Sequence, residues 1–156
     1  AIILREKDLS EAEYENLAKT ALEICEKYNK ELILHTFYDA ALKLNHKKIH
    51  LPIFALKEAC EKGLLANFEK IGTSVHSLEQ LEEAKNCGAT YCTAGHIFAT
   101  NCKKDLPPRG LDFLAEICAN AVFPVYAIGG ISDKNAGLAT EAGAAGVCLM
   151  SSVMDK

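Results

Sequence analysis

The chain has 156 residues, of which 49% are hydrophobic and 24% charged, so it can form one sizeable core and we expect a globular protein. The formal net charge of -4 argues against nucleic acid and acidic membranes as partners, because binding to them needs clustered lysine and arginine. No apolar run approaches the roughly 20 residues that cross a bilayer, and the N-terminus lacks the plan of a signal peptide. We therefore expect a cytoplasmic protein.

Short apolar runs alternate with amphipathic stretches along the whole chain, which is typical of repeated strand and helix units. The predicted strands are Ala1–Leu4, Glu31–Leu34, Lys48–Leu51, Lys70–Val75, Ala89–Ala94, Pro124–Ile128 and Gly146–Met150. The predicted helices lie at 10–28, 38–44, 55–62, 77–88, 110–120 and 133–141, the last of them capped by Ser132. Ser10 and Ser77 are followed three residues later by Glu13 and Gln80, the spacing of a capping box.

Nearly all of these strands are continuously apolar, which indicates a parallel sheet with helices on both faces. An open doubly wound sheet and a closed barrel both fit this order of elements. The chain begins on a strand and ends shortly after one, whereas a barrel usually takes about 200 residues or more. We expect an α/β fold in which residues 1–156 form a single (β/α)8 TIM-barrel domain that lacks its first strand–helix unit and its last helix.

The seven cysteines are an odd number, and six of them lie in apolar, periodic segments. We therefore expect small core residues in a reducing compartment rather than disulfides. No spacing of cysteine and histidine resembles a zinc site, so no metal is expected. Cys102 differs because it lies beside Lys103, and neighbouring cations lower the pKa of a thiol. A solvent-exposed cysteine without a role is the simpler interpretation of Cys102.

His96 follows a predicted strand and opens a loop that holds Lys103, Lys104 and Arg109. Histidine has the unperturbed pKa nearest to neutrality, so a histidine at a strand end can act as acid or base on a bound anion. The pairing of one proton-transfer group with several cations predicts an enzyme that acts on a small anionic molecule.

Two further loops follow predicted strands and suit a phosphate group. Gly129 and Gly130 end one strand, and Met150, Ser151 and Ser152 end the next. Glycines let backbone N–H groups approach a ligand, and a helix N-terminus favours negative charge. A tight turn without a ligand is the simpler interpretation of the glycine pair, but phosphate often binds after strands 7 and 8 of parallel barrels.

Four segments together resemble the thiamine phosphate synthase/TenI superfamily of (β/α)8 barrels: Gly72–Glu79, Gly95–Phe98 with the following lysines, Ala127–Ile131 and Gly146–Ser151. The resemblance runs through nearly the whole chain and is most specific in the C-terminal half. The segment Arg5-Glu6-Lys7 also resembles the family's Arg-x-Lys after strand 2. This implies that the chain runs from strand 2 to strand 8.

The resemblance leaves two activities in competition. Thiamine phosphate synthases join a pyrimidine diphosphate to a thiazole phosphate with Mg²⁺, which is typically held by one Asp after strand 3 and another after strand 4. This chain has His35-Thr36 and Leu51-Pro52 at those places, and Ile3 where the family usually has Gln. Mg²⁺ prefers carboxylate oxygens, so these departures should cripple a magnesium site. Asp39 could substitute only if its loop differs.

The Gly-His-x-Phe motif followed by Cys-Lys-Lys resembles the TenI branch, which is linked to thiazole tautomerase activity in thiamine biosynthesis. That reaction is an aromatising proton shift in a thiazole carboxylate phosphate. It implies that His96 is catalytic and removes a proton from one ring position and delivers one to another, with no cofactor. Mg²⁺ would be needed only if the synthase alternative holds.

The ligand that the resemblance implies is a phosphorylated thiazole, with a homo-oligomer left open. The candidate binding residues are Arg5, Lys7, Ser74, His76, Thr100, Cys102, Lys103, Gly129, Gly130, Met150, Ser151 and Ser152. Arg5 and Lys7 could instead pair with carboxylates such as Glu6, and Ser74 and His76 could orient the ligand or His96. Core or surface roles are expected for His35, His46 and His50. A sensor that kept the phosphate pocket without turnover is a further alternative.

Overall fold

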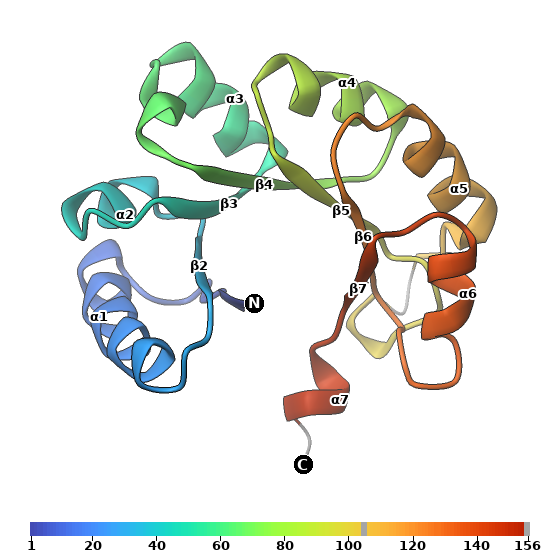
Figure 1. Ribbon diagram of the computed structural model, residues 1–156, viewed down its shortest axis with the longest axis horizontal. Helices are drawn as coiled ribbons and strands as arrows, with labels where there is room; N and C mark the ends of the chain where they lie inside the picture. The colour runs from blue at the N-terminus through green and yellow to red at the C-terminus, as the bar shows by residue number, and fades with distance from the viewer. Residues whose placement is uncertain (104–105, 155–156) are drawn as a thin grey trace. The chain divides into compact units, whose positions relative to one another are not determined.

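The computed structural model describes residues 1–103 and 106–154, without the side chains of Cys102 and Ser152 (Figure 1). The chain divides into two compact units, Ala1–Gly72 and Thr73–Lys156, named unit 1 and unit 2 below. Both units alternate strands with helices, as the hydrophobic pattern predicts. No helix within the described residues is long and apolar enough to span a membrane.

Unit 1 is built on a parallel sheet in which successive strands are neighbours. Its strands are β1 (Ile2–Leu4), β2 (Leu32–His35) and β3 (Lys48–Pro52), and β4 (Lys70–Val75) runs across the boundary into unit 2. Its helices are α1 (Glu11–Lys27), α2 (Tyr38–Lys43), α3 (Ile53–Glu61) and the 3-10 helix η1 (Leu64–Asn67). The register places Leu4 opposite Leu34 and His35 opposite His50.

Helix α1 begins at a complete capping box and is joined to the sheet by a buried tyrosine. The Ser10 side chain accepts from the backbone N–H of Glu13, while the Glu13 carboxylate accepts from the backbone of Ser10. Tyr14 is fully buried, and its hydroxyl donates to the Leu4 carbonyl at 2.7 Å and accepts from the His35 N–H at 2.8 Å. The helix therefore connects the C-terminal ends of β1 and β2.

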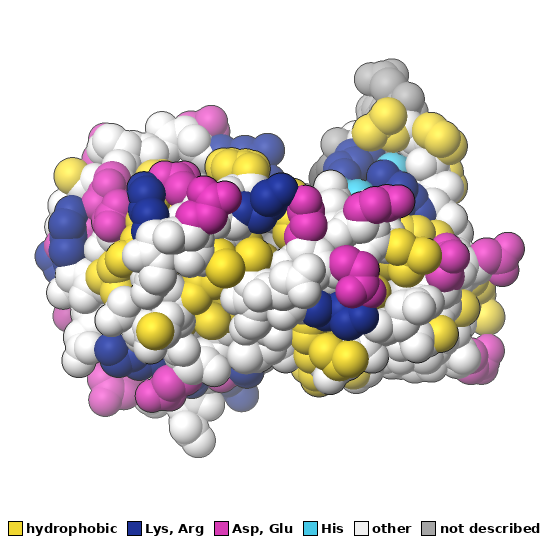
Figure 2. All heavy atoms as spheres, turned by 90° about the horizontal axis from the view of Figure 1, so that it is seen from above, with side chains coloured by type: hydrophobic (Ala, Val, Ile, Leu, Met, Phe, Trp, Pro, Cys, Tyr) yellow, Lys and Arg dark blue, Asp and Glu magenta, His cyan; other side chains and the backbone are white. Residues whose placement is uncertain are grey.

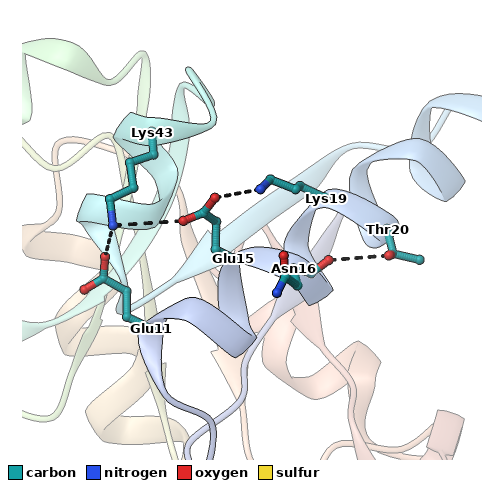
Figure 3. A network of polar contacts seen from close by, with 6 residues as sticks. All are labelled: Glu11, Glu15, Asn16, Lys19, Thr20 and Lys43. Carbon is teal, nitrogen blue, oxygen red and sulfur yellow. Dashed lines mark hydrogen bonds and ion pairs between the residues drawn. The ribbon is translucent and has the colours of Figure 1, made fainter.

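Ion pairs on the outer surface connect α1 to α2. Lys43 Nζ lies 2.8 Å from a Glu11 oxygen and 4.0 Å from one Glu15 oxygen, while Lys19 Nζ lies 2.7 Å from the other Glu15 oxygen (Figure 3). Such exposed pairs contribute about 0–1 kcal/mol each. Burial of Tyr14 and other apolar residues therefore accounts for more of the packing of α1 than these charges do.

Unit 2 repeats the same plan. It contains α4 (Leu78–Asn86), β5 (Tyr91–Gly95), the 3-10 helix η2 (Asn101–Lys103), α5 (Gly110–Asn120), β6 (Val125–Ile128), α6 (Ala136–Glu141), β7 (Gly146–Cys148) and α7 (Ser151–Met154). Strands β5, β6 and β7 pair in parallel in that order. All five residues of β5 are buried, as expected for a strand that is covered on both faces.

The predicted strands and most predicted helices are confirmed, and the differences lie at element ends. The prediction that Ser132 caps a helix from Asp133 is wrong, because the Ser132 N–H donates to the Asn135 side chain and α6 begins at Ala136. The last strand ends at Cys148 rather than at Met150. Parallel α/β architecture is therefore observed, while a closed (β/α)8 barrel over one domain is not confirmed and stays a prediction.

Candidate functional site

The predicted site residues of unit 2 follow three neighbouring strands at one edge of the sheet. In the observed register, Gly95 lies opposite Ile128, and Ile128 lies opposite Cys148. Because the strands are parallel, His96, the glycine pair after β6 and the segment after β7 leave the sheet at the same edge. The fold therefore gathers predicted residues that are more than fifty positions apart in the sequence.

His96 lies at the end of β5 and is only 6% exposed. The peptide bond between Gly95 and His96 is cis, and the His96 carbonyl accepts from the N–H of Arg109 at 2.9 Å. The imidazole Nε2 lies 3.3 Å from the Leu106 carbonyl. A carbonyl can only accept, so Nε2 carries the proton in the neutral ring and Nδ1 keeps a lone pair that no described residue occupies.

Gly129 and Gly130 are needed for the close approach of two loops. A Cβ on Gly129 would lie 2.3 Å from the Cβ of His96, and one on Gly130 would lie 2.4 Å from the Ala99 carbonyl oxygen. Both glycines also have positive φ angles, of 95° and 67°. These glycines therefore pack directly against the backbone that carries His96, a role that neither sequence interpretation included.

The helices that follow the two predicted phosphate loops are short, and phosphate binding at these loops stays a prediction. Five residues separate Gly130 from α6, which has six residues, and the helix that begins at Ser151 has four. Any phosphate here would rely on loop N–H groups and nearby cations rather than on a helix dipole. Met150 and Ser151 are exposed, and the Met150 carbonyl accepts from the N–H groups of Val153 and Met154.

A shallow pocket of about 360 Å³ lies in the loop that follows β5. It is lined by Ala99, Thr100, Asn101, Lys103 and Leu106, and the last of these holds the His96 ring through its carbonyl. Thr100 and Lys103 are predicted binding residues and line this pocket, and their role in binding a ligand stays a prediction. Lys104 and the side chains of Cys102 and Ser152 lie outside the described part of the structure.

His76 connects the end of β4 to the residue before His96. Its Nδ1–H donates to the Gly95 carbonyl at 2.6 Å, and its backbone N–H donates to the Gln80 side chain at 2.7 Å. Burial lowers the pKa of His76, the hydrogen bond to Gly95 opposes that shift, and the charges of Lys103 and Arg109 lower the pKa further. These effects place both cations close to His76. Figure 2 shows histidine atoms beside Lys and Arg side chains on one face of the molecule.

The side chains of Ser74 and Arg109 each contact a neighbouring side chain. The Ser74 hydroxyl lies 3.0 Å from the hydroxyl of Thr93 on the adjacent strand. The Arg109 guanidinium lies over the Phe113 ring at 5.2 Å, a cation–π contact. Within the described residues, Arg109 forms no ion pair with a carboxylate.

Unit 1 has a separate cluster at the C-terminal ends of its strands. The rings of His35 and His50 stack at 5.3 Å with an interplanar angle of 18°. Burial lowers the pKa of His35 to about 4, with a further contribution from Arg5 and Lys7. Burial likewise lowers the pKa of His50 to about 3. Sequence reasoning missed this pair, because only the register reveals that His35 and His50 are opposite.

The predicted alternative for Arg5 and Lys7, pairing with a carboxylate such as Glu6, is not observed. Within the described residues, neither cation forms an ion pair. Both side chains are exposed beside His35.

The donor set of this cluster does not fit Mg²⁺. Where the synthase pattern has carboxylates, this chain has His35, Thr36 and Leu51, flanked by two cations. The described residues contain no group of three or more His, Cys, Asp or Glu side chains that could hold a metal. Asp39 is exposed in the first turn of α2, where its charge acts on Lys43. A hard divalent cation would therefore meet positive charge rather than oxygen ligands.

The fold and site define an α/β protein with parallel strands and a histidine–cation site at their C-terminal ends. A family model described as thiamine monophosphate synthase, TMP-TENI, matches residues 1–153, so the chain belongs to this family. The predicted superfamily is thereby confirmed.

Several relatives and one solved structure are similar over most of this chain. A thiamine-phosphate synthase of Clostridium tetani is 33% identical over 153 residues, covering 98% of this chain and 73% of the relative. A putative thiamine-phosphate synthase 2 of Aquifex aeolicus is 34% identical, covering 97% and 81%. The thiamine phosphate pyrophosphorylase of Pyrococcus furiosus superposes with a TM-score of 0.81 at 30% identity, covering 99% and 74%. These names favour the synthase alternative over the tautomerase hypothesis.

Proposed function

We propose that this member of a thiamine-biosynthesis family is a thiazole tautomerase in which His96 moves a proton on a phosphorylated thiazole carboxylate. The observation that carries the proposal is the placement of His96. It is a buried imidazole at a strand end, its ring bonds the Leu106 carbonyl, and Leu106 and Lys103 line the same pocket. Proton transfer by one positioned histidine is the chemistry that this arrangement supports best.

The proposed step uses the free lone pair of the His96 ring. With Nε2–H donating to the Leu106 carbonyl, Nδ1 removes a proton from one position of the non-aromatic ring. The imidazolium that forms then gives a proton to a second ring position, which yields the aromatic isomer with no atom gained or lost. Burial of His96 limits water around the intermediate.

The cations near His96 suit the two anionic groups of such a ligand. Lys103 lines the pocket, and the Arg109 backbone holds the carbonyl of His96. We propose that Lys103 binds the carboxylate or phosphate, and that loop N–H groups near Gly130 and Ser151 bind the phosphate. Positioning the ring against Nδ1 in this way would supply much of the rate enhancement.

The test compares two matched histidine variants. The ultraviolet change on aromatisation of the unstable thiazole carboxylate phosphate isomer is followed without metal, for the wild type, His96→Gln and His46→Gln. His46 bonds the Leu32 carbonyl in unit 1, and glutamine can keep an N–H donor there. We expect a loss of at least about 100-fold for His96→Gln, as for removal of a general acid–base, and no loss for His46→Gln. An equal rate in both variants would refute the proposal.

Thiamine-phosphate synthase activity is the second candidate, because the relatives carry that name. Against it stands the donor set of unit 1, which offers imidazoles and cations where Mg²⁺ needs oxygens. We expect no magnesium-dependent joining of a pyrimidine diphosphate to a thiazole phosphate. Turnover of both substrates with Mg²⁺ would reverse this order of preference, and tight ligand binding without either reaction would favour a sensor.

A further inference from the structure

Asn135 directly precedes α6 in unit 2, but its side chain does not cap this helix. An asparagine in this position usually accepts from an N–H group two or three residues further on, and the described structure has no such bond. Instead, Oδ1 accepts from the Ser132 N–H at 2.8 Å, and Nδ2 donates to the Gly130 carbonyl at 2.9 Å. Only one assignment of the amide oxygen and nitrogen satisfies both partners, so the side chain has a single orientation. Asn135 therefore holds the preceding loop rather than the helix.

Two successive carbonyls of the glycine loop are held by donors from different parts of unit 2. The Gly129 carbonyl accepts from the N–H of Phe98 at 3.0 Å, and Phe98 lies two residues after His96. The Gly130 carbonyl accepts from the Asn135 side chain. Backbone contacts with the segment that carries His96 therefore fix the first peptide unit of the loop, whereas the next unit depends on one side chain.

The N–H groups of the same two peptide units belong to Gly130 and Ile131. Both peptide bonds are trans, so each N–H points away from the carbonyl of its own unit. The two carbonyl bonds therefore turn these N–H groups away from Phe98 and Asn135. Within the described residues, neither N–H has a hydrogen-bond partner. Successive N–H groups that are available to donate are a common binding element for anions.

The peptide unit after Gly130 needs such a hold because a glycine precedes it. Gly130 has a φ of 67°, and a Cβ there would collide with the Ala99 carbonyl, so only glycine fits. Glycine also tolerates many other backbone conformations, so its peptide unit can rotate at low cost when the carbonyl is not bonded. The second bond of Asn135, to the Ser132 N–H, keeps the amide in place for this task.

We propose that Asn135 is a positioning residue for the phosphate group of the ligand, because it fixes the peptide unit between Gly130 and Ile131 so that the Ile131 N–H donates to a phosphate oxygen. This role rests on the proposed function, which assigns the phosphate to N–H groups of this loop, and it adds the side chain that keeps one of those groups in place. The His96 ring is held separately by the Leu106 carbonyl. Loss of Asn135 should therefore weaken binding of the phosphate rather than proton transfer.

The test uses two ligands that differ only in the phosphate: the aromatic thiazole carboxylate phosphate and the alcohol that remains when its phosphate is removed. Titration of the whole isotope-labelled protein gives both dissociation constants and the NMR shifts of the Gly130 and Ile131 amides. For the wild type, we expect the phosphorylated ligand to shift both amides and to bind at least about tenfold more tightly than the alcohol. Asn135→Leu removes both side-chain bonds at similar volume. It should weaken the phosphorylated ligand at least about tenfold and abolish the Ile131 shift, while affinity for the alcohol stays within about twofold.

Further variants separate positioning from a structural role. Asn120→Leu is the matched control, because Asn120 donates only to the Glu116 carbonyl of the exposed α5 surface, and it should change neither affinity. Asn135→Gln keeps both amide groups and should recover part of the phosphate-dependent affinity. Serine also suits the position before a helix, and its hydroxyl ends one bond short of Nδ2, so Asn135→Ser repeats the comparison with less effect on folding.

The two ligands also separate the possible failures. Equal weakening of both ligands in Asn135→Leu and Asn135→Ser would show a structural role and overturn the inference, and so would unchanged affinity for the phosphorylated ligand. If the wild type binds both ligands equally, the phosphate assignment of the loop fails together with this inference. The rate of His96→Gln still decides the tautomerase proposal in that case, because none of these binding readouts depends on turnover.

Discussion

At the scale of single residues, the candidate active site depends on contacts that lie behind the reacting group. His96 is held by the Leu106 carbonyl, the Arg109 N–H and the backbone beside Gly129. Only His96 itself is expected to touch the reacting atoms. The nearby residues either pack against His96 or position it, and substitutions can separate these two roles.

Replacement of Gly129 tests its close packing against His96. Gly129→Ala puts a Cβ 2.3 Å from His96 at a φ of 95°, so we expect a stability loss of about 1–3 kcal/mol and a large loss of activity. Gly137→Ala is the matched control, because nothing lies within 4 Å of its Cβ and alanine favours a helix. Denaturant unfolding of both variants gives the comparison, and equal stabilities would contradict the packing role.

His76 is predicted to be a positioning residue for His96. His76→Phe removes the N–H that donates to the Gly95 carbonyl, so the imidazole of His96 should move from its productive position. We expect kcat for the tautomerase reaction to fall about tenfold with little change in KM. His76→Asn can still donate an N–H and should recover part of the loss. A rise in KM without a change in kcat would instead indicate that His76 contacts the ligand directly.

At the scale of elements, local sequence signals account for helix starts and tertiary packing accounts for strand partners. The capping box at Ser10 is present as predicted, because it requires only atoms three residues apart. The start of α6 was misplaced because Asn135, not Ser132, precedes the helix, and Asn135 also donates to the Gly130 carbonyl at 2.9 Å. The start of α6 therefore depends on the contact between Asn135 and Gly130, which the local spacing around Ser132 does not reveal.

The capping box gives a stability prediction for α1. Ser10→Ala removes the acceptor for the Glu13 N–H, and we expect a loss of about 1 kcal/mol in the free energy of unfolding. Thr20→Ala is the control, since the Thr20 hydroxyl bonds only the Asn16 carbonyl of the same exposed helix. Chemical denaturation measures the free energy of unfolding of both variants. A loss for Ser10→Ala that is no greater than the loss for Thr20→Ala would contradict the assigned cap.

At the scale of the whole molecule, buried neutral histidines make stability depend on pH. The pKa of His35 falls from an ordinary 6.5 to about 4 and that of His50 to about 3 on folding, mainly through burial. Between pH 6.5 and about 4, the unfolded chain therefore binds more protons than the folded chain, so stability must decrease as the pH falls. The carboxylates whose pKa is lowered, such as Glu31, contribute to this loss only below about pH 4.5.

His50→Phe should reduce that slope. Phenylalanine keeps a buried aromatic ring against His35 but cannot be protonated in the unfolded chain. We expect the slope between pH 6 and 5 to decrease by about 1.4 kcal/mol per pH unit, the effect of one proton. The free energy of unfolding of both proteins, measured from pH 7.5 to 4.5, checks this. Parallel curves would show that His50 is charged in the fold.

The order of strands and helices, the capping box at Ser10 and the family could be inferred from the sequence by itself, whereas the second predicted box is incomplete because the Gln80 side chain accepts from the His76 N–H instead of from Ser77. Each depends on short-range periodicity or on contiguous motifs such as the one around His96. The tertiary structure alone decided that His35 stacks on His50, that Arg5 and Lys7 have no carboxylate partner within the described residues, and that Gly129 packs on His96. These facts depend on strand register and loop approach, and both join residues whose separation along the chain carries no local signal.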